Sequence, residues 1–254
     1  MAYSDGHKHL LKKANARIII SYGRKHKLPF NDYIPLGFTD YMIDSGGFQF
    51  HQGTLQRSLT IGGYCLWLHL ARERHGDVIK SWIGIDTNDY VESLEGYEKM
   101  RKEGLTCVPV WRVKWPDEVL DYLCSEYEYI AVGGVAFTAK KETLRNTWQK
   151  VISKYPHVKV HMLGVGVRSG TTFKTFRPYS IDVSTWTAPA RFGMELVFDK
   201  KQVIRETSLP DDLKQRLRDD KKYEEEVIYK AIKVLQWLET GMDNMNEPWQ
   251  QHML

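Results

Sequence analysis

The sequence predicts an α/β fold, a trimmed (β/α)8 TIM barrel in which some helices shrink to short connections. Short β-rich runs recur along most of the chain, and they are near-continuously apolar, which is typical of parallel strands covered on both faces. Amphipathic helical stretches lie between several of these runs, and this strand–helix alternation favours a barrel. A doubly wound open sheet shows the same alternation, so strand counting leaves it as the alternative.

Eight runs are expected to form the strands: 17–22 (RIIISY), 41–44 (YMID), 81–86 (SWIGID), 107–111 (CVPVW), 129–134 (YIAVGG), 158–166 (VKVHMLGVG), 179–183 (YSIDV) and 194–199 (MELVFD). Helices are expected at 55–75, 89–103, 116–126 and 138–154, and the third opens with the Pro-Asp-Glu signature of a helix start. The connections after LGVG and SIDV are too short for long helices, which is why the barrel is expected to be trimmed.

Beyond residue 208 the chain is strongly helical, with a charged first half. We expect this helix to pack on the outside of the barrel, although a helix that contacts a partner or a nucleic acid has the same pattern. The expected organisation is a barrel domain over 1–208 and a C-terminal helix and tail over 209–254. The apolar stripe of the helix consists of Val227, Ile228, Ile232, Leu235 and Leu238.

Composition sets broad limits on function. Hydrophobic residues make up 42% of the 254 residues and charged residues 27%, which is ordinary for a soluble globular protein. The formal net charge of +4 permits a nucleic-acid partner without requiring one. The sequence contains no signal-peptide core and no run of about 20 apolar residues, so we expect a soluble, cytoplasmic protein that makes no membrane contact.

The three cysteines are Cys65, Cys107 and Cys124, an odd number spread far apart. No CxC, CxxC or HExxH pair occurs, so neither a disulfide framework nor a zinc site is indicated. We expect buried free thiols, no bound metal and no cofactor.

Three aspartates follow expected strands directly. Asp44 comes after YMI, Asp86 after WIGI and Asp182 after YSI. The carboxyl ends of barrel strands open onto one face, where active sites are built. A single aspartate of this kind is more simply a helix N-cap. Three of them, with the glycine-rich strand ends VGGV and LGVGV between, indicate a pocket instead.

Carboxylates around one pocket suit chemistry at an anomeric carbon. One carboxylate attacks C1′ or stabilises its positive charge, while another carries the proton of the leaving group. The glycines let a flat ligand approach the backbone, and Phe48 is placed to stack on such a ligand. The residues alone therefore predict a carboxylate-based glycosyl-transfer or hydrolysis site that accepts a planar group.

The string DSGGFQ (44–49) resembles the signature of the tRNA-guanine transglycosylase superfamily, barrel enzymes that replace a guanine in a polynucleotide with a 7-deazaguanine. The segments IGIDTND, IAVGGVA, HMLGVG and SIDVSTW resemble other blocks of that family in the same order, over about residues 40–190. The tRNA enzymes are longer and carry a Cys-x-Cys-x-x-Cys and His zinc site, which this sequence lacks. The chain is therefore most similar to the short phage-type DNA 7-deazaguanine transglycosylases.

The resemblance implies a role for each acid. Asp182 would be the nucleophile that holds the sugar covalently, Asp44 the general acid/base, and Asp86 the acceptor for the N1–H and 2-amino group of the purine. Trp111 and Arg112 stand where the family has a Gln-Gly pair, which leaves the details of base choice open. The other expected base-binding residues are Ser45, Gly46, Phe48, Gln49, Gly133, Gly134, Val135, Leu163 and Gly164.

Basic and aromatic residues near the expected mouth suggest a path for a polynucleotide. The partners expected from the resemblance are DNA in preference to tRNA, and a free 7-deazaguanine base related to preQ0. A phage-encoded enzyme of this kind would work in the host cytoplasm, where the modified base can shield a phage genome from restriction. The expected nucleic-acid contacts are Arg112, Lys114, Trp115, Lys140, Arg168, Lys174 and Arg177.

Three other readings stay open. The chain could act on tRNA, it could be a non-catalytic barrel subunit that binds the base or a partner protein, or it could be a glycoside hydrolase that uses the same acids. Retention of both Asp44 and Asp182 argues against the non-catalytic subunit. The sequence leaves the oligomeric state open, a monomer included.

Overall fold

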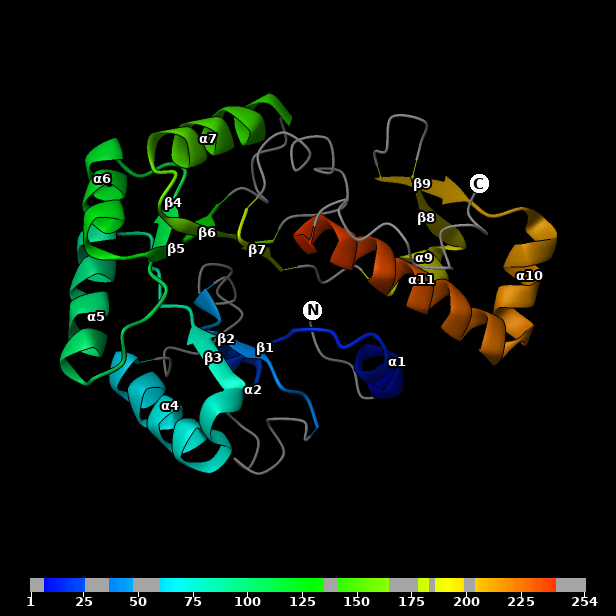
Figure 1. Ribbon diagram of the computed structural model, residues 1–254, viewed down its shortest axis with the longest axis horizontal. Helices are drawn as coiled ribbons and strands as arrows, with labels where there is room; N and C mark the ends of the chain where they lie inside the picture. The colour runs from blue at the N-terminus through cyan, green and yellow to red at the C-terminus, as the bar shows by residue number, and fades with distance from the viewer. Residues whose placement is uncertain are drawn as a thin grey trace.

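The computed structural model describes residues 7–25, 37–47, 60–134, 141–164, 178–182, 186–198 and 204–240. Within these ranges the protein is a mixed α/β structure with parallel sheets (Figure 1). The first sheet contains β1 (Ile18–Ser21), β2 (Tyr41–Asp44) and β3 (Ile79–Trp82), paired in that order. The second contains β4 (Val110–Arg112), β5 (Tyr129–Gly133), β6 (Lys159–Met162) and β7 (Ser180–Ile181), again in chain order.

A parallel bridge between Ile83 and Val108 joins the two sheets. The amide of Gly84 donates to the carbonyl of Val108 at 2.9 Å, and the amide of Val108 donates to Trp82 at 2.8 Å. The described parallel strands therefore follow one another in the order β1 to β7. This confirms the expectation of parallel strands, and the reason is burial: Ile18, Ile43 and Val110 are almost fully buried, as both-face coverage requires.

The four expected helices between strands are present as α4 (Ile61–His75), α5 (Tyr90–Lys102), α6 (Asp117–Glu126) and α7 (Lys141–Lys154). Two have side-chain N-caps: Thr60 accepts from the amide of Gly63 at 3.0 Å, and Asp89 accepts from Val91 at 2.8 Å. The turn η3 (Gly76–Val78) connects α4 to β3. In Figure 1 these helices lie one after another around the outside of the strands. Residues 55–59 and 138–140 of the expected helices lie outside the described ranges.

The expectation that residues 194–199 form the eighth parallel strand is wrong. It forms β8 (Met194–Phe198), which pairs antiparallel with β9 (Ile204–Ser208) in a separate two-stranded sheet. The sequence did not predict β9. Because β9 follows β8 after a short connection, the two strands satisfy each other's backbone groups without the long crossover that a parallel partner needs. The short helices α1 (Lys8–Lys13), α2 (Tyr22–Lys25) and α9 (Ala188–Phe192) were not predicted either.

The C-terminal helical region divides into α10 (Asp211–Asp219) and α11 (Lys221–Thr240). Asp220 separates them, and its carboxylate accepts from the amides of Lys222 at 3.0 Å and Tyr223 at 3.1 Å, which caps the start of α11. The apolar stripe of α11 is buried at Val227, Ile228, Ile232 and Leu235, while the side chain of Leu238 lies outside the described set. Gln236 donates to the carbonyl of Ala14 at 2.8 Å, so α11 packs beside α1.

The three cysteine thiols are buried, as expected, and each is free. Burial raises the pKa of Cys107 and of Cys124 to about 12, so both remain protonated at neutral pH. Among the helices that the structure describes, none combines the length and the apolar character that crossing a membrane requires.

Candidate functional site

The three aspartates lie at the carboxyl ends of parallel strands. Asp44 is the last residue of β2, Asp182 follows β7 directly, and Asp86 comes three residues after the bridge at Ile83. Because β2, β3 and β7 run in the same direction, their carboxyl ends share one side of the sheets. The segments that follow β2, β5, β6 and β7 on this side leave the described ranges from residues 48, 135, 165 and 183 onward.

Asp182 titrates near neutral pH. Burial, and to a smaller extent the negative charge of Asp44, raise the pKa of its carboxyl, while a hydrogen bond from the amide of Gly164 to Oδ1, 2.5 Å long, lowers it; the net pKa is about 6. The side chain of Asp182 is 22% exposed, so it can still be reached. Asp44 and Asp182 therefore act on each other electrostatically, although 138 residues of chain, the difference of their numbers, separate them.

Gly164 has a backbone shape that suits this contact. It ends the turn after β6 with φ +66°, in the left-handed region that glycine adopts at low cost. That conformation turns its N–H toward Asp182 Oδ1. Gly164 was expected in the base pocket. In the structure its amide contacts Asp182, the candidate nucleophile.

The DSGG turn packs directly on Asp86. Ser45 is 1% exposed, and its hydroxyl donates to the carbonyl of Gly84 at 3.1 Å and accepts from the amide of Gly47 at 3.4 Å. A Cβ placed on Gly47 would lie 2.4 Å from Asp86 Oδ1 and 3.2 Å from its carbonyl oxygen. Only glycine fits there without moving Asp86. The first and second aspartate segments therefore form one unit.

Arg112 also belongs to this unit. From the end of β4 its Nη1 donates to the carbonyl of Thr87 and to Asn88 Oδ1, both at 3.0 Å, and its Nε lies 3.9 Å from Asp86 Oδ2. The side chains of Arg112 and Asp86 are only 16% and 14% exposed. Arg112 was expected to contact a polynucleotide. In the structure its guanidinium contacts the segment 86–88 of the protein itself.

Two buried tyrosines donate hydrogen bonds to the backbone of the strands near the acids, and neither was predicted from the sequence. The hydroxyl of Tyr64 donates to the carbonyl of Ile83 at 2.9 Å, and that of Tyr97 donates to Val110 at 3.1 Å. Burial raises the pKa of both tyrosines well above the usual value; the charge of Asp44 adds to the shift of Tyr64, and the charge of Asp86 to that of Tyr97. Both hydroxyls therefore stay neutral donors.

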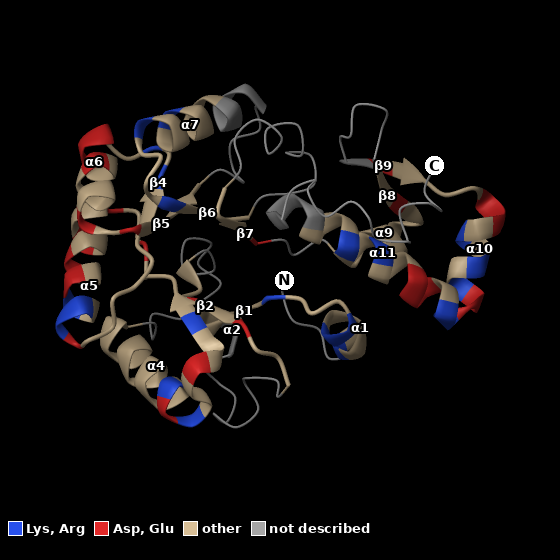
Figure 2. Ribbon diagram, in the orientation of Figure 1, with Lys and Arg blue, Asp and Glu red and all other residues tan. Residues whose placement is uncertain are grey.

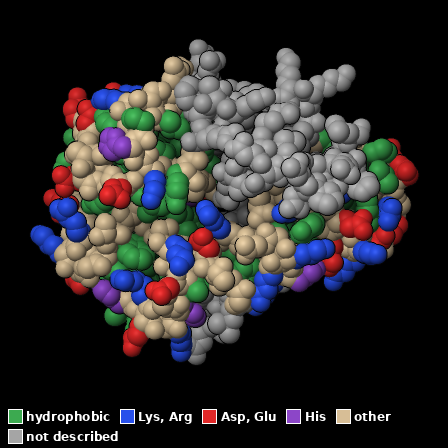
Figure 3. All heavy atoms as spheres, in the orientation of Figure 1, with side chains coloured by type: hydrophobic (Ala, Val, Ile, Leu, Met, Phe, Trp, Pro, Cys, Tyr) green, Lys and Arg blue, Asp and Glu red, His purple; other side chains and the backbone are tan. Residues whose placement is uncertain are grey.

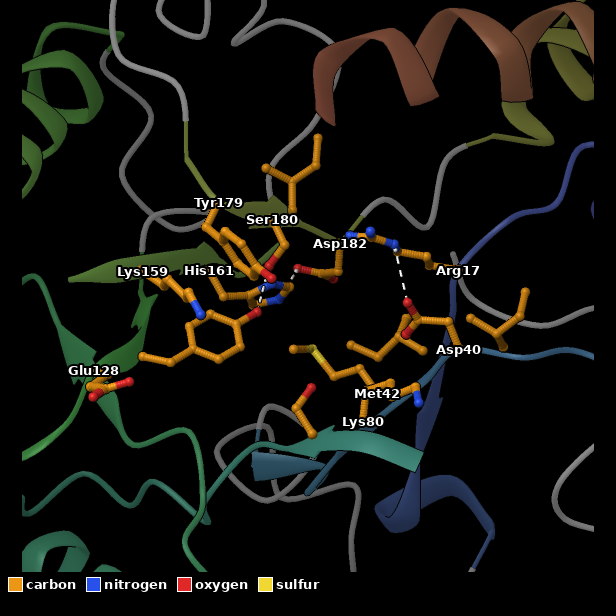
Figure 4. Close-up of a pocket in the computed structure, with 15 residues that line it drawn as sticks. Arg17, Asp40, Met42, Lys80, Glu128, Lys159, His161, Tyr179, Ser180 and Asp182 are labelled. Atoms are coloured by element: carbon orange, nitrogen blue, oxygen red, sulfur yellow. Dashed lines mark hydrogen bonds and ion pairs between the residues drawn. The ribbon is translucent and has the colours of Figure 1, made fainter. Parts of the chain in front are cut away.

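A cavity of about 430 Å³ reaches Asp182 from the amino ends of the strands (Figure 4). Its mouth is lined by residues that precede or begin strands, and an ion pair of 3.2 Å between Arg17 and Asp40 crosses one side of it. The cavity lies on the opposite side from the one expected for the base. The other charged residues that line it are Lys80, Glu128 and Lys159, and its inner part includes Met42, Tyr129, His161 and Ser180.

The remaining expected site residues fall into two groups. Gly133 ends β5 and Gly134 follows it, Gly46 lies in the DSGG turn, and Leu163 follows β6, so these residues do lie at carboxyl strand ends. A Cβ on Gly133 would lie 2.9 Å from Val110 Cγ1, so this glycine also serves the packing between β4 and β5. The residues that lie outside the described ranges are Phe48, Gln49, Val135, Lys140, Arg168, Lys174 and Arg177.

Trp115 was expected to contact nucleic acid, but it is buried. It is 7% exposed, and its ring meets Tyr90 edge to face at 6.4 Å, so it belongs to the core and does not offer a stacking surface. The neighbouring Lys114 is exposed on the turn after β4. Along the helices in Figure 2, and on the described part of the face in Figure 3, basic and acidic side chains are interspersed.

Within the described ranges, no group of three or more His, Cys, Asp and Glu side chains is placed to hold a metal ion. No protein-family model matches the chain, and no curated protein matches it at a significant level. The arrangement of Asp44, Asp86 and Asp182 on parallel strand ends is therefore the basis for a functional assignment.

Proposed function

We propose that this protein is a base-exchange transglycosylase that replaces guanine in DNA with a preQ0-like 7-deazaguanine through a covalent glycosyl-aspartate intermediate. The observation that carries the proposal is the pair Asp44 and Asp182. They end parallel strands, they act on each other electrostatically, and the pKa of Asp182 is raised to about 6. Double displacement at C1′ needs two carboxylates with different protonation duties, and such a coupled pair provides them.

We infer that the parallel strands β1 to β7 close into a barrel. The support comes from the cavity, which is lined both by Arg17, Ile18 and Ile19 at the first strand and by residues 179–182 at the last. Strands in chain order with helices outside them are the architecture of a (β/α) barrel. The hairpin of β8 and β9 would then lie beside the barrel, with α11 packed on the same side.

In the first half-reaction, the Asp182 carboxylate attacks C1′ of the target nucleotide, and an ester bond forms as the bond from C1′ to N9 of guanine breaks. The electron pair of that bond leaves with the base, and Asp44, an anion in the free protein, takes up a proton when the substrate binds and gives it to the departing guanine. A carboxylate with a pKa near 6 is ionised at neutral pH and is more basic than an ordinary one, which suits a nucleophile.

In the second half-reaction, the Asp44 carboxylate takes the N9 proton of the incoming 7-deazaguanine. N9 then attacks C1′, the ester bond to Asp182 breaks, and its electron pair returns to the carboxylate. Both aspartates regain their starting protonation states, so the exchange consumes no proton overall.

Asp86 would read the base edge. A carboxylate accepts hydrogen bonds from an N1–H and a 2-amino group, and Asp86 is held for this task by Gly47 on one side and by Arg112 on the other. Arg112 also balances the charge of Asp86 in a half-buried place. We propose DNA as the polynucleotide because the short phage-type enzymes are the members that the sequence most resembles; a target base in duplex DNA must then leave the stack.

The test is incorporation of labelled guanine into polymer, with DNA and tRNA offered separately. Label should enter DNA with the wild type and not with Asp182→Ala, while Asp212→Ala, an exposed acid on α10, should match the wild type. Exchange by Asp182→Ala at the wild-type rate would contradict the nucleophile. Entry of label into tRNA alone would contradict the choice of DNA, and no entry into either polymer would contradict base exchange.

A further inference from the structure

A line of polar contacts, two of them hydrogen bonds, runs along the cavity wall to the candidate nucleophile. The hydroxyls of Tyr129 on β5 and Ser180 on β7 are 2.6 Å apart, and Ser180 Oγ lies 2.6 Å from Nδ1 of His161 on β6. The other ring nitrogen of His161, Nε2, lies 3.7 Å from Asp182 Oδ1. Figure 4 shows His161 and Ser180 beside Asp182, with the dashed lines running from one side chain to the next.

His161 is not explained by packing alone. It is 1% exposed in the middle of an apolar strand, and its Nε2 has no hydrogen-bond partner although it is buried. A buried polar atom without a partner costs free energy, so it needs a reason. Nε2 faces the carboxylate of Asp182 at 3.7 Å, which is longer than a hydrogen bond, so their contact in the ligand-free protein is electrostatic.

Donor and acceptor chemistry fixes the direction of the line. An ionised carboxylate only accepts, so Nε2 of His161 must carry the proton when it faces Asp182. Burial lowers the pKa of His161 to about 3, so the ring is neutral and Nδ1 accepts. Ser180 then donates to Nδ1, and Tyr129 donates to Ser180. This arrangement satisfies Nδ1 of His161 and the hydroxyl of Ser180, and it leaves the Nε2–H of His161 directed at Asp182, which fixes the tautomer of His161.

We propose that His161 is a positioning residue, with its Nε2–H aimed at Oδ1 of Asp182 so that the carboxylate is held as an anion for attack, and that Ser180 and Tyr129 hold the imidazole in the required tautomer. The catalytic consequence rests on the base-exchange function proposed above. The amide of Gly164 donates to the same Oδ1, so two donors address one oxygen. Oδ2 is therefore the oxygen assigned to the attack on C1′. Active-site hydrogen bonds are often long before substrate binds, and closure of the 3.7 Å gap would accompany binding.

Other charges also act on Asp182, and the experiment must separate them. Asp44 acts from β2, and the charged groups that line the shared cavity are Arg17, Asp40, Lys80, Glu128 and Lys159. None of these is removed when His161 is replaced by an uncharged residue, because His161 is itself neutral. A shift in the titration of Asp182 then reports the loss of the donor.

The experiment titrates Asp182 directly, through the carboxyl carbon-13 signal of labelled aspartate, assigned with Asp182→Asn. His161→Leu removes the donor, His161→Gln keeps an N–H near the same place, and His157→Leu replaces an exposed histidine as a control. We expect His161→Leu to raise the pKa of Asp182 by about one unit. We expect His161→Gln to recover most of the shift and His157→Leu to cause none. The same pKa in His161→Leu as in the wild type overturns the proposal.

Ser180→Ala and Tyr129→Phe keep the proposal testable if His161→Leu does not fold. Loss of the Ser180 hydroxyl frees the tautomer of His161, so the Asp182 pKa should rise, and Tyr129→Phe should give a smaller rise in the same direction. No rise in Ser180→Ala also overturns the proposal. In the wild type, formation of the covalent adduct with DNA should follow the Asp182 titration. Absence of the adduct would contradict the proposed base-exchange function, while the carbon-13 titration would still decide the role of His161.

Discussion

Gly47 and Asp86 are in such close contact that a Cβ on the glycine would lie 2.4 Å from the carboxylate oxygen. The contact joins the turn after β2 to the segment after β3. It also explains the second of the two glycines after Ser45, because Gly47 must leave room for an acid that follows another strand, while Gly46 adopts a positive φ of 85°.

Gly47→Ala should weaken binding of the base with little loss of fold. The added methyl group must push Asp86 away, and displacement of a reading group by about 1 Å commonly costs tenfold to a hundredfold. The measurement is the dissociation constant of the free 7-deazaguanine. Gly62→Ala is the matched control, because a Cβ at Gly62 meets nothing within 4 Å. Equal affinities of the two variants would contradict a role for Asp86 in base binding.

Asp182→Asn should stabilise the protein at neutral pH and have little effect in acid. The folded pKa of about 6 lies above the ordinary 3.8, so between these values the folded state holds a proton that the unfolded state has released. The contribution of Asp182 to the free energy of unfolding therefore falls as the pH rises from about 4 to about 6. Above pH 6 the folded state carries the whole cost of the buried charge. The amide avoids that cost, which is roughly 3 kcal/mol.

Urea unfolding at about pH 4 and about pH 7.5 measures this difference. Asp77→Asn, an exposed acid in η3, serves as the control and should change neither value by much. A stabilisation by Asp182→Asn that is as large in acid as at neutral pH would show that its source is not the ionisation of Asp182.

Asp44→Asn should lower the pKa of Asp182. The charge of Asp44 is one of the causes that raise it, and the amide keeps the shape of the side chain without the charge. We expect a fall of about half a unit to one unit, measured by the same carbon-13 titration. A pKa that stays at its wild-type value in this variant would mean that the two acids do not interact, and the two-carboxylate mechanism would lose its main support.

Arg112→Met should destabilise the protein by about 1–3 kcal/mol, because the partly buried carbonyl of Thr87, the side chain of Asn88 and Asp86 lose their cationic partner. Chemical denaturation measures the change. Arg101→Met is the comparison: Arg101 pairs with Glu98 and Glu126 on an exposed surface, where ion pairs contribute little. A similar effect of both substitutions would show that Arg112 is not structurally tied to the 86–88 segment.

The strands were readable from the sequence where their apolar runs are unbroken. YMID predicts a strand at the bounds of β2, and RIIISY predicts one that contains β1. The expected strand 81–86 begins too late, because Lys80 breaks the apolar run and lines the cavity mouth. The eighth strand failed for a different reason: the run MELVFD has the composition of a strand, but composition does not say which partner the strand pairs with.

The site was readable only in part. A strand-end aspartate is a local feature, so Asp44, Asp86 and Asp182 could be singled out from short strings. The link from Arg112 to Asp86 depends on how β4 aligns with the segment after β3, which no local pattern encodes. His161 sits in an apolar run, and a histidine there was a signal that went unused. Its meaning comes from Ser180 and Asp182, which only the pairing of β6 with β7 brings close.

The bridge between Ile83 and Val108, which joins the two sheets, bears on how the proposed activity would depend on folding. Among the described residues, Asp44 and Asp86 belong to the three-stranded sheet, and Asp182 to the four-stranded one. Neither sheet alone holds both carboxylates of the proposed double displacement. The backbone amides of Gly84 and Val108, which close this junction, therefore mark where a local opening would separate nucleophile from acid/base while each half stayed folded. Under the proposed function, activity would depend on this junction between the two sheets and would be lost on such an opening before either sheet unfolds.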